Sequence, residues 1–261
     1  MTGQRLALVT GATSGIGAAF AAELARRGWS IILVARDPDR LSSTTAALPG
    51  GEHSSFVADL STDEGMSLVC ERLASDVDPV ELLVHAAGMG TTAPFPEAPL
   101  AEEEAMLRLN VLSALRLSHA AAHAMRARGT GGIVMISSTA AYWSAGTYAA
   151  SKAWVLSATL GLAARLAGTG VRVLAVSPGF TRTEFHARSG TNASGVQPWM
   201  WLDPAEVARD SLDALDAGRS VCVPGRRYRA LVETVRHLPP GGRAAVLRRL
   251  APLRPESRPE S

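Results

Sequence analysis

Short apolar runs alternate with helical segments along the chain, and this alternation constrains the fold more than any other feature. Most of the runs are rich in Val, Ile, Leu or Ala over five to seven residues, as in strands buried on both faces of a sheet. They lie at residues 5–10, 30–35, 53–58, 80–85, 131–137, 171–176 and 220–224. Helical segments separate them, at about 15–27, 37–48, 62–75, 101–127, 147–168 and 203–218. Strands joined through helices pair in parallel, so the sequence predicts a single-domain, doubly wound α/β fold of Rossmann type, in three α/β/α layers.

The composition fits a globular domain and argues against several other classes. Of the 261 residues 47% are hydrophobic, which suffices for one core, and a net charge of only +2 argues against a dedicated nucleic-acid binder. Cys70 and Cys222 lie far apart and match no metal-ligand spacing, so no metal is expected. No run reaches the ~20 apolar residues that cross a bilayer, and the first residues do not resemble a secretory signal. We therefore expect a cytoplasmic protein.

A glycine-rich turn follows the first strand and opens the first helix, with the sequence Thr10-Gly11-Ala12-Thr13-Ser14-Gly15-Ile16-Gly17. Small residues allow the backbone to approach a pyrophosphate closely, and a helix N-terminus supplies N–H donors and a favourable dipole. The position between strand and helix favours a dinucleotide site. The alternative is an ordinary turn, since turns use glycine widely.

Tyr148 and Lys152 lie four residues apart in the alanine-rich helix expected over 147–168, so their side chains share one helix face. A cation beside a phenol favours the phenolate and is expected to lower the tyrosine pKa toward neutrality, which suits a proton donor and acceptor. Lys152 is the only lysine in a chain that otherwise uses arginine, which indicates a position where a compact ammonium matters. The alternative is a solvated surface pair.

These motifs stand in the order found in the short-chain dehydrogenase/reductase superfamily, and the chain resembles its compact single-domain branch over about residues 4–225. The spacing of Gly11, Gly15 and Gly17 after Thr10 is that branch's cofactor motif. Further matching positions follow in chain order: Asp59-Leu60, Ala87-Gly88, Asn110, Ser137-Ser138, Tyr148, Lys152, Pro178-Gly179, Thr181 and Thr183. The resemblance implies an NAD(P)-dependent oxidoreductase that interconverts a ketone and a secondary alcohol.

The resemblance also implies roles for four catalytic candidates. Tyr148 would exchange a proton with the substrate oxygen, Lys152 would acidify the phenol and hold the nicotinamide ribose, and Ser138 would orient the carbonyl. Asn110 would hold a helix kink and a water that links Lys152 to solvent. Cofactor contacts are implied for Gly11, Thr13, Ser14, Gly15, Ile16, Gly17, Arg36, Asp59, Leu60, Ala87, Gly88, Tyr148, Lys152, Pro178, Gly179, Thr181 and Thr183.

Two features depart from the family pattern. Ser138 and Tyr148 are only ten residues apart, so the loop beside the substrate pocket is shortened. Ser137, Thr139 or Ser144 are therefore alternative sources of the hydroxyl.

The second departure is His85-Ala86 before Ala87-Gly88, where the family commonly has two asparagines. Ala86 cannot make an asparagine's backbone-bridging hydrogen bonds, so this segment is expected to lose local rigidity. We interpret His85 as a packed residue at the strand end rather than as a base.

Arg36 occupies the end of the second strand, where enzymes that prefer NAD need an acidic side chain for the ribose 2′-hydroxyl. A guanidinium there suits a 2′-phosphate, so we predict NADP(H). The alternative is that Asp37 reaches the ribose while Arg36 stacks on the adenine. By resemblance, Asp59 meets the adenine amino group and Leu60 lines that pocket.

Residues 184–204 correspond to a substrate lid in the family. Large apolar side chains gather there and nearby: Phe95, Tyr142, Trp143, Trp199, Met200 and Trp201. They favour a roomy pocket for a lipophilic or aromatic ketone, with the alternative that they only pack the lid to the body.

The remaining expectations concern the C-terminus and partners. We assign 1–225 to the catalytic domain, 226–254 to a basic helical extension with eight arginines and one glutamate, and 255–261 to a disordered tail. We expect the extension to be a solvated helix, with a membrane or partner contact as the alternative. By resemblance the alanine-rich helices form a homodimer or homotetramer. The main alternative function is a catalytically silent NADP-binding sensor or scaffold, and another is a peripheral membrane enzyme acting on lipid-derived ketones.

Overall fold

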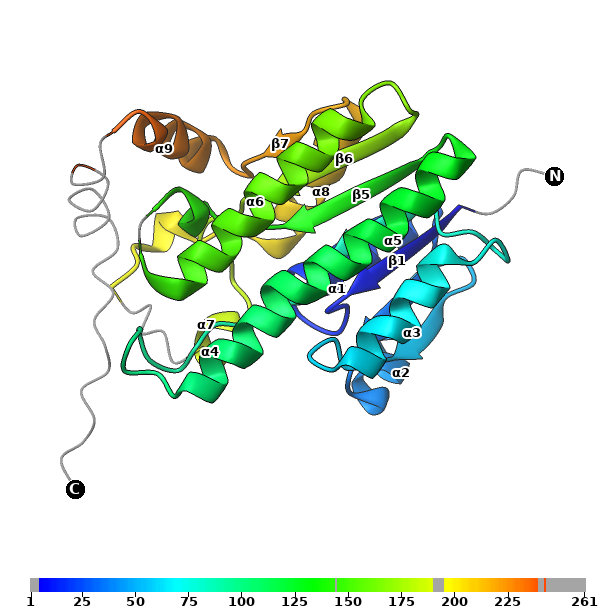
Figure 1. The fold of residues 1–261 in the computed structure, drawn as a ribbon, viewed down its shortest axis with the longest axis horizontal. Helices are drawn as coiled ribbons and strands as arrows, with labels where there is room; N and C mark the ends of the chain where they lie inside the picture. Colours follow the sequence, from blue (N-terminus) through cyan, green and yellow to red (C-terminus); the bar gives the residue numbers. More distant parts are fainter. Residues whose placement is uncertain (1–4, 144, 190–194, 239–241, 243–261) are drawn as a thin grey trace.

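The computed structural model describes residues 5–143, 145–189, 195–238 and 242. Within these residues seven strands form one parallel sheet in the order β3-β2-β1-β4-β5-β6-β7, which confirms the doubly wound fold (Figure 1). The strands are β1 (Leu6–Thr10), β2 (Ser30–Ala35), β3 (Ser54–Val57), β4 (Leu82–His85), β5 (Gly131–Ile136), β6 (Val171–Val176) and β7 (Val221–Cys222).

Helices cover both faces of the sheet, as the sequence predicts. Figure 1 shows α3 (Asp63–Ala74), α5 (Ser113–Arg128) and α6 (Gly146–Leu166) on one face, with α1 (Gly15–Arg26) and α8 (Pro204–Asp216) on the other. Shorter helices complete this part of the chain: α2 (Pro38–Ala46), α4 (Leu100–Leu107), α7 (Phe185–Arg188) and α9 (Arg226–Arg236).

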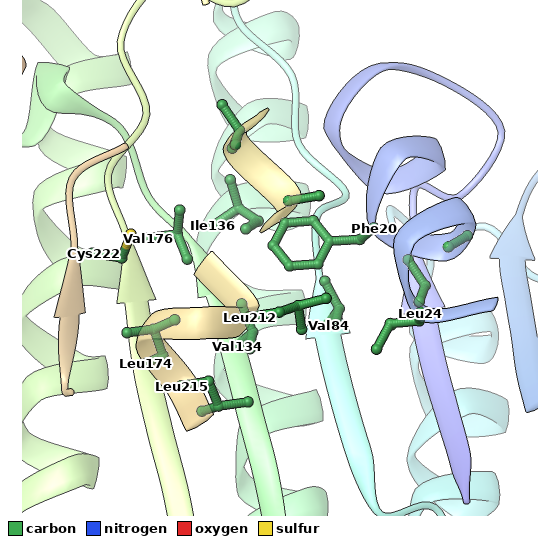
Figure 2. Packing of buried hydrophobic residues seen from close by; sticks show 14 of the residues in the cluster. Phe20, Leu24, Val84, Val134, Ile136, Leu174, Val176, Leu212, Leu215 and Cys222 are labelled. Atoms are coloured by element: carbon green, nitrogen blue, oxygen red, sulfur yellow. The ribbon is translucent and has the colours of Figure 1, made fainter. Parts of the chain in front are cut away.

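Two apolar clusters hold these layers together, one on each face of the sheet. On the α1/α8 face Phe20 and Leu24 of α1 meet Leu212 and Leu215 of α8 over the central strands (Figure 2). On the other face Leu117 of α5 belongs to a second fully buried cluster. Since both faces of the central strands are covered, their residues are almost all apolar.

The strand order reverses between β1 and β4, and the loops that follow the strands meet at the carboxyl edge of the sheet. This crevice is where open α/β sheets bind their ligands. The glycine-rich turn, the segment after β4, the segment after β5 and the segment after β6 all lie at this edge. The fold thus brings together the motifs that are far apart in the sequence.

The long helix expected over 101–127 is not continuous. It consists of α4, a π-turn over Arg108–Leu112 and α5. The apolar periodicity runs through the break, so it could not reveal the inserted turn. β4 also begins at Leu82 rather than at Val80. The neighbouring strand β1 begins at Leu6, whose carbonyl accepts from the Glu81 N–H, so no residue of β1 lies opposite Val80.

The C-terminal elements bear on two expectations. Asp203 caps α8 by accepting from the backbone N–H of Ala205 at 2.8 Å, as its position before Pro204 predicts. In α9 the apolar residues Tyr228, Val232 and Val235 are buried against the body, and the arginines face outward.

This packing leaves α9 no free apolar face, which favours a solvated surface helix over a membrane contact for residues 226–236. Among the described residues no helix has the length and apolar content to span a bilayer. Residues 239–241 and 243–254 of the predicted extension, and the tail at 255–261, lie outside the described residues.

Candidate active site

Tyr148 and Lys152 lie on the first turns of α6, and Ser138 is the second residue after the end of β5. The Ser138 side chain is hydrogen-bonded to the Tyr148 phenol, and the Lys152 ammonium lies 5.9 Å from the centroid of the tyrosine ring. The structure therefore brings three of the four catalytic candidates together. A hydroxyl bonded to a phenol, with an ammonium near the ring, can move a proton to or from a bound oxygen.

Lys152 is buried, with only 6% of the residue exposed, and it is not the solvated surface lysine of the alternative interpretation. Its Nζ donates to the backbone oxygen of Ile136 at 3.2 Å, and the Ser137 hydroxyl donates to the Lys152 carbonyl at 2.7 Å. Burial lowers the pKa of Lys152 to about 8. The ammonium is therefore still charged at neutral pH.

The expected direction of the Tyr148 pKa is wrong in this structure. Burial raises the pKa of Tyr148 to about 12, and the hydrogen bond with Ser138 lowers it only in part. The physical reason is that desolvation penalises the phenolate more than the nearby groups stabilise it. Sequence spacing revealed the neighbouring charge but not the burial.

Asn110 lies in the π-turn and is linked to the same site through Ser151 of α6. Its amide forms a pair of hydrogen bonds with the backbone of Met89, accepting from the N–H at 2.9 Å and donating to the carbonyl at 2.8 Å. It also donates to Ser151 Oγ at 3.1 Å, and this hydroxyl donates to the Tyr148 carbonyl at 2.7 Å. Asn110 thus ties the loop after β4 to the first turns of α6, in agreement with the helix irregularity expected there.

The alternative hydroxyls are less well placed than Ser138. Ser137 is buried and its hydroxyl is bonded to the Lys152 carbonyl, while Thr139 is also buried. Ser144 lies outside the described residues. Ser138 caps the short helix over Thr139–Tyr142 by accepting from Ala140 N–H at 3.1 Å, which fixes its side chain beside Tyr148.

The glycine-rich turn has the geometry that a pyrophosphate requires. Gly15 opens α1 with a φ of +53°, and a Cβ at Gly17 would overlap the carbonyl of Gly11, so neither position accepts a side chain without strain. Ser14, the N-cap, makes no side-chain hydrogen bond to the first turn. The N–H groups there are thus not capped by a side chain, as an anion site at a helix N-terminus requires. Thr13 and Ile16 lie in the same turn.

Arg36 stands at the end of β2 with 71% of its side chain exposed, 4.0 Å from the Asp59 carboxylate. Asp37 instead caps α2, accepting from the N–H groups of Asp39 and Arg40 at 3.0 Å. One carboxylate oxygen of Asp37 is thus occupied, which favours Arg36 as the group that faces a ribose or its phosphate. Leu60, after Asp59, is buried as an adenine-pocket wall would be.

Other expected cofactor residues converge on the same edge. A Cβ at Gly15 would lie 2.9 Å from Thr183 Cγ2, so the turn after β1 touches the segment after β6. A Cβ at Gly11 would lie 3.0 Å from Ala87 N, which places the turn against the segment after β4. Pro178 accepts from Thr139 N–H at 2.9 Å.

Two more candidates, Gly179 and Thr181, lie behind this surface. Thr181 is buried and donates to the Gly179 carbonyl at 3.0 Å. The ring of Tyr228 lies directly over Gly179, and its hydroxyl accepts from Phe180 N–H at 3.0 Å and donates to the Met200 carbonyl at 2.8 Å. Tyr228 therefore braces the segment after β6 from α9.

The segment predicted to be a lid contains α7, which places Phe185 against the tyrosine. The Phe185 ring centroid lies 5.6 Å from that of Tyr148, and a Cβ at Gly90 would lie 3.5 Å from Phe185 Cζ. His186 stacks edge-on with Phe185 and with Trp201 at 5.6 and 5.2 Å. Residues 190–194 of the lid lie outside the described residues.

The large apolar side chains divide into two groups. Trp143 and Met200 are buried and Tyr142 packs against the core, which matches the packing alternative for these residues. Trp199 is 54% exposed and borders a cavity of about 470 Å³. The cavity is lined by Trp199, Met200, Trp201, Leu202, Glu206, Gly225, Arg226, Arg227, Tyr228 and Leu231.

Sequence reasoning missed three participants. Phe185 and Tyr228 contact the site from α7 and from α9, and no local pattern distinguishes them from ordinary aromatic residues. Arg40 donates to the Thr13 carbonyl at 3.1 Å and pairs with the Glu184 carboxylate at 3.2 Å. Its position one turn after Arg36 was the signal that could have found it.

Comparison with known proteins gives a consistent result. The sequence model of the family described as short chain dehydrogenase matches residues 5–194. Serine 3-dehydrogenase from Rhizobium radiobacter is 30% identical over 236 residues, covering 82% of this chain and 94% of that protein.

Two solved structures resemble this one closely. A short-chain dehydrogenase from Sphingobium yanoikuyae in complex with NADPH superposes with a TM-score of 0.82 at 30% identity, over 98% of this chain and 99% of the other. The bulky-bulky ketone specific alcohol dehydrogenase from Comamonas testosteroni superposes with a TM-score of 0.77 at 30% identity, over 89% and 92%.

Proposed function

The chain belongs to the short-chain dehydrogenase family, whose members are oxidoreductases acting on CH–OH groups, and from this premise we propose that it interconverts a lipophilic or aromatic ketone and its secondary alcohol with NADP(H). The observation that carries the proposal is the contact of Ser138 with Tyr148 above the buried Lys152. Bound at the glycine-rich turn, the nicotinamide would supply or accept the hydride.

Tyr148 acts as the acid in the reductive direction. With a pKa of about 12 its phenol holds its proton at neutral pH and donates it from Oη to the carbonyl oxygen. When a ketone binds, the single proton of the Ser138 hydroxyl turns from the phenol to that oxygen, donates a second hydrogen bond to it and fixes its orientation.

Lys152 stabilises the phenolate that the transfer leaves behind. Its ammonium lies 5.9 Å from the centroid of the ring, and a positive charge at this range attracts the negative charge of a phenolate. Asn110 keeps α6 in register with the loop after β4 through Ser151 and Met89. These four residues together form the catalytic set that we propose.

The preference for NADP(H) rests on charge at the end of β2. Arg36 is exposed there, Asp37 is engaged as a helix cap, and Arg40 lies one turn further along beside the glycine-rich turn. A guanidinium fork suits a 2′-phosphate and gives no advantage with a 2′-hydroxyl. The Sphingobium relative, solved with NADPH, supports the same choice.

The substrate class follows from the lid. Phe185 covers Tyr148, and Phe180, His186 and Trp201 extend this apolar surface away from it. A site walled by aromatic rings desolvates bulky apolar groups and offers little to a sugar phosphate. The Comamonas relative, described as specific for bulky-bulky ketones, supports this assignment.

We also propose a homodimer or homotetramer. Exposed apolar side chains project from the helices on one face: Leu107 of α4, Leu115 of α5, and Trp154 and Leu160 of α6. Such a surface is commonly covered by a second subunit, and static light scattering tests this. A cytoplasmic location and the lack of a nucleic-acid partner stay predictions from the sequence.

The decisive experiment measures reduction of a panel of bulky aromatic ketones with NADPH by the wild type and by Tyr148→Phe. We expect turnover to fall by at least about a hundredfold in the variant, since the acid is removed. NADPH binding, followed by its fluorescence, should persist. Unchanged turnover would reject Tyr148 as the acid, and tight NADPH binding by a wild type that reduces no ketone would favour the sensor.

A further inference from the structure

A continuous chain of hydrogen bonds begins at the carboxyl end of β1. Thr10 Oγ1 accepts from the backbone N–H groups of Ala86 and Ala87, each at 3.1 Å. It also lies 2.9 Å from His85 Nδ1. A hydroxyl has two acceptor positions and one proton, so with both acceptor positions filled the Thr10 proton must point to Nδ1.

The direction of this bond fixes the tautomer of His85. Since Nδ1 accepts, the ring proton of a neutral imidazole sits on Nε2, and Nε2 lies 3.1 Å from the Ser113 hydroxyl. Ser113 in turn donates to the Leu109 carbonyl at 2.5 Å. The side-chain donors and acceptors of Thr10, His85 and Ser113 are then all satisfied inside the protein, where His85 is only 3% exposed.

The two ends of this chain meet the active site. Leu109 lies in the π-turn directly before Asn110, whose amide is paired with the Met89 backbone. Ala87 leads into Gly88, where a Cβ would lie 3.1 Å from Asn110 Oδ1 and 3.2 Å from Lys152 Nζ. The His85 ring therefore spans the gap between the loop after β4 and the π-turn, immediately behind the proposed proton path.

We propose that His85 is a positioning residue of the active site, which holds the π-turn through Ser113 so that Asn110 presents its amide to Met89 and keeps the loop beside Lys152 in place. This deepens the proposed function and rests on it. Burial lowers the pKa of His85 to about 3, with the Lys152 charge acting in the same direction, so the ring stays neutral at pH 7. Thr10 and His85 together replace the backbone bridge that Ala86 cannot make.

The first test needs no turnover. In protein labelled with ¹⁵N-histidine, the His85 signals, identified by their loss in His85→Gln, should show Nε2 protonated and Nδ1 unprotonated at pH 7. A ring protonated on Nδ1, or on both nitrogens, would overturn the relay.

The second test compares two buried serines with the same local geometry. Ser113 and Ser211 each lie in a helix and donate to the carbonyl four residues earlier, but only Ser113 touches His85. Ser113→Ala should speed hydrogen exchange at the Met89 amide, and Ser211→Ala should not. Equal exchange at Met89 in both variants would reject the proposal even if the enzyme turned over normally.

The third test uses kinetics, with a readout that simple destabilisation would not reproduce. His85→Gln keeps a donor near the Nε2 position, His85→Asn keeps an acceptor near the Nδ1 position, and His85→Leu keeps neither. When the π-turn and Asn110 are no longer held in place, kcat should fall about ten- to a hundredfold in His85→Leu and His85→Asn, with KM for the ketone little changed.

In His85→Gln most of this kcat should return. A kcat that follows the thermal stability of the three variants, or an Asn variant as active as the Gln variant, would contradict the proposal. A wild type without ketone reductase activity would remove the proposed function and leave the tautomer and exchange results to decide on His85.

Discussion

Replacing Lys152 with methionine should stabilise the fold at neutral pH while removing activity. The fall of the Lys152 pKa from its ordinary 10.5 to about 8 corresponds to about 3 kcal/mol of free energy of unfolding, since a tenfold change in proton affinity is worth about 1.4 kcal/mol. Methionine keeps a similar length and carries no charge. The substitution also removes the hydrogen bond from Lys152 Nζ to the Ile136 carbonyl, which lowers the stability by about 1 kcal/mol.

The sign follows from protonation in the two states. Below pH 8 the lysine is charged both folded and unfolded, so the folded state bears the full penalty of the buried charge. Between pH 8 and 10.5 the folded protein has released the proton and the unfolded chain has not, so stability of the wild type rises with pH. Above 10.5 both states are neutral and the penalty is absent.

Lys152→Met should therefore be about 2 kcal/mol more stable than the wild type at pH 7 and about 1 kcal/mol less stable near pH 11. Urea unfolding followed by circular dichroism, at one protein concentration and several pH values, measures the difference. Thr159→Val is the matched control, because it removes a buried non-titrating side chain from the same helix. A stability difference for Lys152→Met that does not change between pH 7 and 11 would refute the reasoning.

Three further results are expected. Arg36→Ala should weaken NADPH binding about ten- to a hundredfold in calorimetry and leave NADH binding unchanged, since it removes a charge-assisted bond to the 2′-phosphate; equal losses for both would place Arg36 elsewhere. Glu184→Gln breaks an exposed pair with Arg40, worth at most about 1 kcal/mol, so NADPH should bind up to about fivefold more tightly; weaker binding would contradict competition for that guanidinium. Reductive kcat should decline as pH rises through about 8, because Lys152 loses its charge while Tyr148 keeps its proton to about 12; a stopped-flow profile flat to pH 10 would count against the assigned role of Lys152.

Much of the architecture could be predicted from the sequence because burial on both faces leaves near-continuous apolar strands, such as Ser30–Ala35 between two covering helices. The cap at Asp203 was equally readable, since it depends on residues next to it. The π-turn was not, because its stability depends on contacts of Asn110 and Ser113 with residues more than twenty positions away.

The candidate site shows the same division. Family motifs identified Tyr148, Lys152 and Ser138, which the structure brings together. The Tyr148 pKa is raised rather than lowered. The sequence spacing of Tyr148 and Lys152 indicates that a positive charge lies near the phenol, but it does not indicate how far burial excludes water from it. Tyr228 escaped notice because it lies beyond the part of the chain that carries the family resemblance.

The contact of Tyr228 with Gly179 has a practical consequence for engineering. A chain trimmed to the family match at residue 194, or to residue 225, would lack the ring that supports the segment after β6. Deletion libraries and solubility tags should accordingly leave α9 intact. Exchanging α9 between relatives offers a way to alter the segment after β6 without touching the proposed catalytic side chains.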